Sequence, residues 1–241
     1  MKKYSKIFTS ILAFIYMLPA MAQDAAENVA SDPGIHQQIK NYFIEGNPKF
    51  MAFVLICLIL GLALCIERII YLNMAQSNTD DILDNVESQL NSGGVGAAKE
   101  YLRNTKGPVA SIFYQGLERA DEGVDMVEKS VVSYGQVQMG LMEKGLSWIS
   151  LFIALAPMLG FMGTVIGMIK AFDDIASAST INAAVVASGM KLALITTVSG
   201  LVVAIILQIF YNYILSKIDS IVNDMENASI SLVDMIVKHK A

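Results

Sequence analysis

The side chains that usually carry out chemistry are scarce in this sequence. Its two histidines, His36 and His239, lie near opposite ends of the chain, and its two cysteines, Cys57 and Cys65, lie eight residues apart in one apolar stretch. On a helix that spacing is too long for a disulfide, so the cysteines are interpreted as small hydrophobic residues. Neither histidine stands in a motif typical of a metal or catalytic site. The sequence therefore predicts a protein that is not an enzyme and that has no catalytic residue, metal site or cofactor.

Binding of phosphate groups is also disfavoured. Residues 93–100 (GGVGAAKE) are rich in glycine, but no glycine precedes the lysine directly and no serine or threonine follows it, so they do not form a phosphate loop. The formal net charge is -5 and there is no basic run. The sequence therefore excludes a nucleic-acid partner.

Two long apolar stretches, residues 145–169 and 192–216, offer hydroxyl groups instead of acids. Neither contains an aspartate or glutamate, so this chain cannot by itself form a carboxylate proton relay there. Small and polar residues recur in both at intervals of three and four, which places them on one face of a helix. In the first stretch they are Ala156, Gly160, Gly163, Thr164 and Gly167, and on the helix of the second they are Gly189, Ala193, Thr197, Gly200, Ala204, Gln208 and Tyr211.

These small-residue faces have two interpretations. In one, they pack two helices of the same chain, and the hydroxyls of Thr164 and Thr197 bond carbonyl groups of their own helices. In the other, they line a shared cavity that accepts a helix of another chain, because two such faces exceed what one three-helix bundle needs. Pro157 removes one helical hydrogen bond from the first stretch and predicts a kink there.

The composition is typical of a membrane protein. Hydrophobic residues make up 54% of the 241 residues and charged residues only 16%. Charge-free stretches of 25 residues exceed the hydrocarbon thickness of a bilayer, whereas the first such stretch, 50–66, has 17. Its flanking Lys49, Glu67 and Arg68 are expected to extend toward the membrane interfaces. We predict an all-α membrane protein with three transmembrane helices, at 50–72, 145–169 and 189–216, the last two extended into a cytoplasmic helical domain.

The N-terminus predicts a secretory signal peptide over residues 1–22. Three lysines precede an uncharged apolar stretch, and Ala20 and Ala22 suit the signal peptidase. An uncleaved first membrane helix is the alternative. Lysine and arginine number ten on the side that holds 73–144 and four on the other, which predicts a periplasmic mature N-terminus and a cytoplasmic C-terminus. The remaining predicted segments are a periplasmic segment at 23–49, a cytoplasmic helical loop at 73–144, a periplasmic loop at 170–188 and a cytoplasmic helical tail at 217–241.

The polar segments carry helix signals of their own. Helical spacing without a proline from Val124 to Trp148 predicts one long helix that enters the second span. The tail keeps apolar residues at helical spacing after the third span, and a further helix, rather than the membrane surface, is its predicted contact. Shorter helices are predicted at 34–46, at 79–90 and at 109–120. Thr79 is the predicted cap of the second of these, residues 91–94 end it, and another short helix follows as far as Arg103.

The two long spans resemble a known family. Residues 156–172 (APMLGFMGTVIGMIKAF) look like the APLLGLLGTVxGMIxxF signature of the MotA/TolQ/ExbB proton channel family, and residues 192–212 are similar to its second signature. The resemblance extends over about residues 50–241. Within the family it is closest to ExbB, the larger inner-membrane subunit of the TonB energising complex.

This resemblance implies a function and partners. It implies an inner-membrane proton channel or motor subunit that uses the proton motive force to energise TonB-dependent transport. The expected partners are further copies of the chain, in a pentamer, an ExbD-like single-span subunit whose aspartate carries protons, a TonB-like protein and membrane lipid. The family threonines map onto Thr164 and Thr197, with Thr196 adjacent, as residues of the proton pathway. Gly160, Gly163, Gly167, Gly200 and Ala204 are the expected packing or partner contacts.

The sequence departs from the family pattern at one position, and three other functions are compatible with it. Many members carry a glutamate early in the third span, where this chain has Leu192 beside Lys191, so a role assigned to that glutamate does not transfer. A TolQ-like subunit for envelope maintenance and a gliding-type stator are alternatives within the family. A membrane scaffold or passive permease without ion coupling is the alternative from another class.

Overall fold

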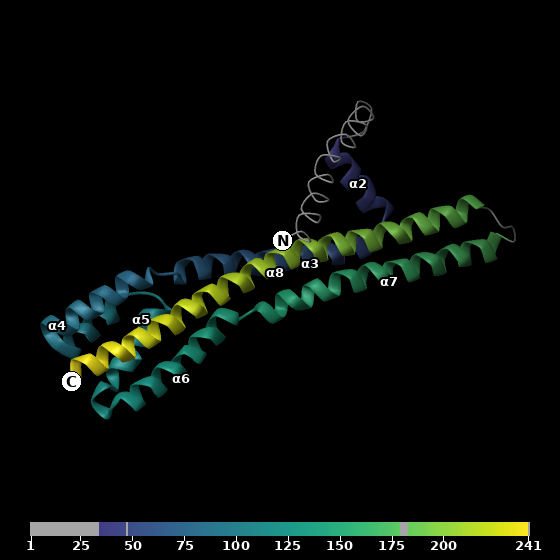
Figure 1. Cartoon of the computed structure of the whole chain (residues 1–241). Helices are drawn as coiled ribbons and strands as arrows, with labels where there is room; N and C mark the ends of the chain where they lie inside the picture. Colours follow the sequence, from purple (N-terminus) through teal and green to yellow (C-terminus); the bar gives the residue numbers. More distant parts are fainter. Residues whose placement is uncertain (1–33, 47, 179–182, 241) are drawn as a thin grey trace, which may run out of the picture. The chain divides into compact units, whose positions relative to one another are not determined.

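The computed structural model describes residues 34–46, 48–178 and 183–240, which are helical with no strand among them. The predicted all-α class is therefore confirmed, and the predicted signal peptide lies outside the described residues. The helices are α2 (Ile35–Glu45), α3 (Pro48–Ala75), α4 (Thr79–Asn104), α5 (Pro108–Glu118), α6 (Val124–Glu143), α7 (Leu146–Ala178) and α8 (Ala183–Lys240), with a short 3₁₀ helix, η2 (Ala120–Glu122), after α5 (Figure 1).

The chain divides into two compact units, residues 1–48 and 49–241. In the first unit, α2 begins after Gly34 and ends at Gly46, whose amide donates a hydrogen bond to the Tyr42 carbonyl over 2.8 Å. This helix matches the one predicted for residues 34–46. All other helices described below belong to the second unit.

Among the residues that the structure describes, three helices are long and apolar enough to cross a membrane, namely α3, α7 and α8. Large apolar side chains stand exposed along all three, among them Ile59 on α3, Phe161 on α7 and Ile209 on α8. Such helices, apolar on every side, are stable in hydrocarbon and not in water. The exposed apolar side chains therefore require an apolar environment, which lipid or the spans of a further chain can supply.

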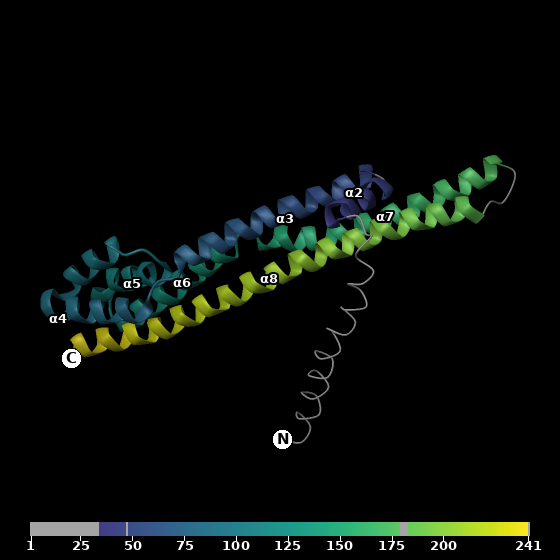
Figure 2. The ribbon, with the colours of Figure 1, turned by 90° about the horizontal axis from the view of Figure 1, so that it is seen from above.

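Helix α3 lies along the α7 and α8 pair (Figure 2). It buries one row of residues that recurs every three or four positions and includes Val54, Cys57, Gly61 and Cys65. A Cβ atom added to Gly61 would lie 2.6 Å from Leu207 Cδ1, so the Leu207 side chain of α8 packs against α3 at this glycine. Both cysteines are free and buried, as expected of small hydrophobic residues.

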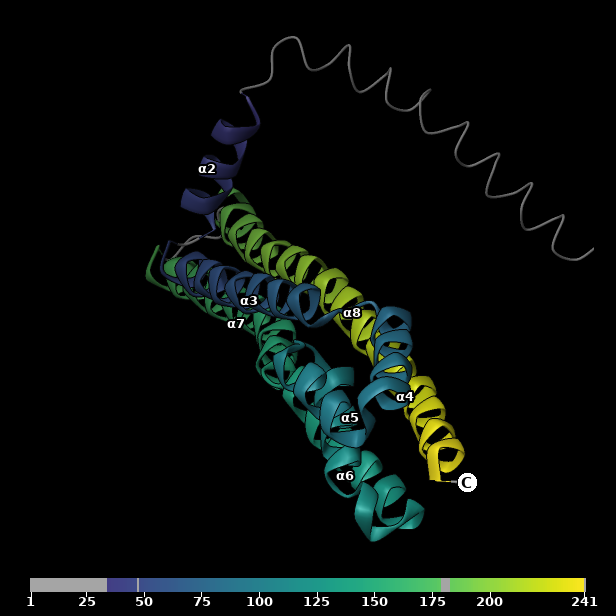
Figure 3. The same cartoon turned by 90° about the vertical axis from the view of Figure 1, so that its left-hand side faces the viewer.

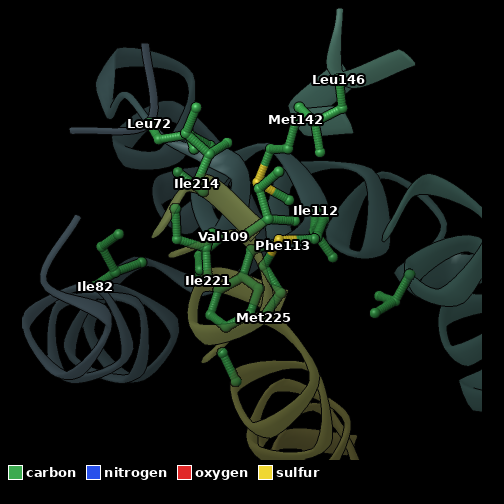
Figure 4. Packing of buried hydrophobic residues seen from close by; sticks show 14 of the residues in the cluster. Leu72, Ile82, Val109, Ile112, Phe113, Met142, Leu146, Ile214, Ile221 and Met225 are labelled. Atoms are coloured by element: carbon green, nitrogen blue, oxygen red, sulfur yellow. The ribbon is translucent and has the colours of Figure 1, made fainter. Parts of the chain in front are cut away.

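The polar bundle consists of α4, α5, α6 and the part of α8 that follows Ser216 (Figures 1 and 3). Its centre is Phe113 of α5, which is fully buried. Ile214, Ile221 and Met225 of α8 gather around the same core, together with Ile112 and Val109 (Figure 4). The apolar face predicted for the tail thus packs against helices of its own chain.

Glycine and proline set the helix ends inside the polar bundle. Gly94 has φ 70 and ψ -166, a conformation outside the helical region, so α4 is two helical segments joined at this residue. This break is the stop predicted at residues 91–94. Asn78, rather than the predicted Thr79, is the cap residue of α4, and its side-chain amide donates to Asp81 Oδ2 over 2.6 Å.

The prediction of one unbroken helix from Val124 into the second span is wrong at Gly145. Helix α6 ends at Glu143, and α7 begins at Leu146, because Gly145 adopts φ +88 between them. The Gly145 carbonyl then accepts the first backbone bonds of α7, from Trp148 over 3.1 Å and Ile149 over 3.3 Å. A glycine just past a helix end takes this left-handed conformation without a steric cost.

Arg68 stabilises the break between α6 and α7. The sequence predicts that its side chain extends toward the membrane interface, but the residue is only 6% exposed. Its Nη1 donates to the Leu141 carbonyl over 3.0 Å, its Nε bonds Glu67 over 3.2 Å, and its guanidinium lies 4.8 Å from the Tyr71 ring centre. Carbonyls in the last turn of a helix lack partners, and Arg68 supplies a donor to one of them.

The break predicts different effects for alanine at two nearby glycines. We expect Gly145→Ala to destabilise the protein by about 1–2 kcal/mol, because alanine is strained at positive φ. Gly140→Ala is the matched control, since Gly140 lies inside α6 with open space around it, and should be neutral or stabilising by up to about 1 kcal/mol. The melting temperature of each variant in the same detergent is the measurement, and equal effects would contradict the assigned conformation of Gly145.

Candidate functional site

The backbones of α7 and α8 touch each other at two glycines. A Cβ atom added to Gly160 of α7 would lie 2.8 Å from the Thr196 carbonyl oxygen and 3.1 Å from the Thr197 Cα. A Cβ added to Gly200 of α8 would lie 2.5 Å from the Ala156 carbonyl oxygen. Neither position can hold a side chain unless a backbone moves. Close approach through small residues is how membrane helices gain contact in lipid, where no hydrophobic force drives them together.

Two further glycines of α7 continue the contact. Above Gly163 lies the Thr196 side chain, whose Oγ1 is 2.8 Å from the position of an added Cβ. Above Gly167 lie Leu192 Cδ2, at 3.0 Å, and Ala193 Cβ, at 3.5 Å. The predicted packing residues Gly160, Gly163, Gly167 and Gly200 therefore pack two helices of one chain, as the first of the two interpretations expects.

The three threonines differ in their surroundings. Thr196 is 0% exposed, and its hydroxyl donates to the Ala193 carbonyl over 2.7 Å. Thr164 and Thr197 are partly buried; the Thr164 hydroxyl donates to the Phe161 carbonyl of its own helix. The Thr197 hydroxyl instead points across to α7, where it reaches the Gly160 carbonyl over 3.4 Å. The structure thus places Thr196 inside the contact and the other two at its edge.

A second polar row runs along α8 beside the buried face. The buried face comprises Ala193, Thr196, Gly200, Val203 and Leu207, of which Ala193, Thr196 and Gly200 lie against α7 and Leu207 lies against Gly61 of α3. At about 100° per residue, another set of residues lies about a quarter turn away and is only partly covered. We call this set the polar strip; it comprises Thr197, Ala204, Gln208, Tyr211 and Asn212.

The polar strip contains amides within an apolar helix. Gln208 and Asn212 are exposed, and the Gln208 side-chain amide donates to Asn212 Oδ1 over 3.0 Å. Amide groups that face hydrocarbon without a partner carry a large free-energy cost, so they usually face a bundle interior or a cavity. The chain covers this strip only in part. The strip therefore keeps the second interpretation, a surface shared with another chain, open for Thr197 and Ala204.

The structure differs from the pattern expected from the sequence at two points of this region. Asn212 did not enter the predicted row, although its spacing of four from Gln208 was a signal for it. The predicted row also placed Gly200 and Thr197 on one face, whereas the structure buries the first and leaves the second at the edge. Pro157 lies inside α7, which continues on both sides of it, and the kink there stays a prediction.

Comparison with known proteins identifies the family. Residues 104–227 match the MotA/TolQ/ExbB proton channel family. An ExbB homolog of Methanothermobacter thermautotrophicus is 34% identical over 171 residues, which cover 70% of this chain and 60% of that protein. An ExbB-like protein of Synechocystis sp. is 31% identical over 64% of this chain and 74% of its own length. The biopolymer transport protein ExbB of Salmonella typhimurium is 36% identical over 39% of this chain and 37% of that protein.

The chain belongs to the MotA/TolQ/ExbB proton channel family. Together with three helices among the described residues that are able to span a bilayer, this makes it a multi-pass inner-membrane protein, close to ExbB. The region that matches this family contains both the α7 and α8 contact and the polar strip. The chain spans 60% of the length of the Methanothermobacter relative and less of the Salmonella protein.

The contact between α7 and α8 predicts that a single methyl group disrupts this pair. We expect Gly200→Ala to destabilise the protein by about 1–3 kcal/mol, because the added carbon meets the Ala156 carbonyl, which no side-chain rotation can move away. The melting temperature in detergent measures the effect, with Gly140→Ala as a glycine-to-alanine change in open space. If the two variants melt alike, the backbones of α7 and α8 are not in contact at this point.

Proposed function

We propose that the chain is an ExbB-like subunit that uses the proton motive force, together with an ExbD-like single-span partner, to energise TonB-dependent transport across the outer membrane. Several copies, five by resemblance, enclose the partner helix. The free energy released by proton movement is passed to a TonB-like protein, and lipid surrounds the ring of copies. The chain itself catalyses no reaction and binds no cofactor, metal ion or nucleic acid.

The polar strip is the observation that carries this proposal. It places a threonine hydroxyl and two amides along an apolar helix, yet residues 145–169 and 192–216 contain no acid. The passage of one proton down a membrane potential of 100 mV releases about 2.3 kcal/mol. A titratable carrier is needed to convert this free energy into movement. A carboxylate on a partner helix beside the strip supplies that carrier. Thr164 and Thr197 then solvate the carboxylate as its charge changes, and Ala204 leaves room for the helix.

Topology completes the proposal. A cleaved signal peptide places the mature N-terminus in the periplasm, and three spans bring the C-terminus to the cytoplasm. The polar bundle then lies in the cytoplasm, on the side richer in lysine and arginine. The loop between α7 and α8 lies in the periplasm.

Reconstitution tests the proposal directly. Vesicles that contain the purified chain alone should lose a pH gradient no faster than protein-free vesicles, because the two long spans, 145–169 and 192–216, contain no acid. Vesicles that contain the chain with an ExbD-like single-span protein that carries an aspartate should lose the gradient faster. Replacement of that aspartate by asparagine should abolish the difference. Fast decay with the chain alone would overturn the proposed division of labour.

Removal of single hydroxyl groups tests Thr197 of the polar strip and Thr164 of α7. We expect Thr164→Val and Thr197→Val each to preserve folding and to reduce proton flux through the complex by about fivefold, since each loses about 1 kcal/mol of hydrogen bonding. Ser199→Ala is the control, because the Ser199 hydroxyl bonds the Ile195 carbonyl at 2.8 Å on another side of α8. Thr196→Val, at the buried position, should lower the melting temperature instead. Full flux in a stably folded Thr164→Val, Thr197→Val double variant would rule out a proton pathway along the strip.

A further inference from the structure

Helix α6 of the polar bundle borders a groove that is apolar at its floor and acidic at its rim. The groove lies between α6 and α8, has a volume of about 660 Å³ and includes Ile112 of α5 at its floor. Val132 and Ile230 line it and are 56% and 65% exposed. Its charged residues are Glu128, Glu226 and Asp234, and no lysine or arginine is among the residues that line it. We call this surface the acidic groove.

A second hollow with the opposite charge lies on the other side of α6. It has a volume of about 310 Å³ and is formed by α5 and α6. Its charged residues are Arg119 and Lys129, and no aspartate or glutamate is among the residues that line it, although Arg119 Nη1 also donates to Glu122 Oε2 over 3.4 Å. Val137, which is 53% exposed, gives it an apolar side chain. We call this surface the basic face.

The two surfaces flank the same helix. Glu128 of the acidic groove and Val137 of the basic face are nine residues apart on α6, which corresponds to about half a turn of the helix in projection. Both surfaces belong to the polar bundle, whose helices carry the polar sequences of the chain. Exposed apolar residues gathered in two hollows, each rimmed by charge, are typical of an interaction site in a protein segment that water surrounds.

We propose that the acidic groove of one copy binds the basic face of a second copy of this chain. The charges match, since Glu128, Glu226 and Asp234 meet Arg119 and Lys129, and each surface brings apolar residues to the contact. An anionic lipid headgroup does not fit the groove, because three carboxylates repel it. This inference rests on the homo-oligomer of the proposed function and assigns it a contact surface outside the membrane.

The contact joins two different surfaces, and this determines the type of assembly. A contact in which one surface meets itself gives a closed dimer, whereas a contact between two different surfaces repeats from copy to copy and gives a ring when the rotation between copies closes. Every copy then uses its acidic groove toward one neighbour and its basic face toward the other. The polar bundles form a ring of their own, in line with the ring of spans.

Crosslinking tests the proposed contact. In a Cys57→Ala, Cys65→Ala background, Glu226→Cys and Lys129→Cys in the same chain should give a ladder of covalent multimers with a short bismaleimide in native membranes. The pair Asp234→Cys and Arg119→Cys should do the same, so that the result does not depend on one geometry. Each cysteine alone should give no multimer, and a mixture of two single-cysteine chains should stop at dimers. Dimers from Glu226→Cys alone would overturn the proposal, because they require the acidic groove to meet itself.

Charge reversal provides an independent measurement. Glu226→Lys and Lys129→Glu should each lower the crosslinking yield of the Asp234 and Arg119 pair by up to about fivefold at low salt, and the double variant should restore it. A double variant that is no better than the single variants would contradict the pairing. Native mass spectrometry separates the two hypotheses. A ring without either crosslink overturns this contact and leaves the proposed function intact, whereas a monomer under all conditions overturns the homo-oligomer itself.

Discussion

The backbone contact between α7 and α8 is the constraint on which the membrane part of the structure depends. Gly160 and Gly200 allow a Cα-to-carbonyl approach that any side chain would block. In lipid, where apolar surface gains little from burial, such contacts and the dispersion forces between close atoms hold helices together. The same contact fixes the rotation of both helices about their axes. It therefore determines which residues face α7, which face lipid, and which remain for another chain.

The position of the polar strip follows from this rotation. The glycines of α7 lie against one face of α8. Thr197, Ala204 and Gln208 therefore lie about a quarter turn away from that face. The Thr197 hydroxyl lies close enough to reach the Gly160 carbonyl, at 3.4 Å, and retains lone pairs that can accept a further bond. The membrane part of α8 carries amides and hydroxyls, which can solvate a charged group, but it contains no acid. The missing carboxylate is the physical argument for a partner that supplies one.

Periodicity predicted the elements well and their faces less well. Long charge-free stretches specify the spans through hydrophobicity alone, and Gly94 and Pro108 mark helix boundaries through backbone conformation. Thr196 and Thr197 are different, because small residues every three or four positions define a face only within about 100°. Which of two neighbouring threonines is buried depends on where the glycines of α7 lie, and no pattern within α8 contains that information. The helix break at Gly145 was not predicted for a related reason, because one glycine in a regular pattern is compatible with an unbroken helix.

The break at Gly145 also explains why Arg68 is buried. An uninterrupted helix would satisfy the Leu141 carbonyl with the amide four residues later, but Gly145 turns the chain away. The carbonyl then needs another donor. Arg68 of α3 provides that donor, and Glu67 and the Tyr71 ring offset part of the cost of burying the guanidinium. Helix α8 passes from the membrane into the polar bundle without a break, whereas α6 and α7 are joined through Lys144 and Gly145, and Arg68 of α3 binds the last turn of α6. The first span is thus tied to the polar bundle by a hydrogen bond that exists only because the second span is interrupted.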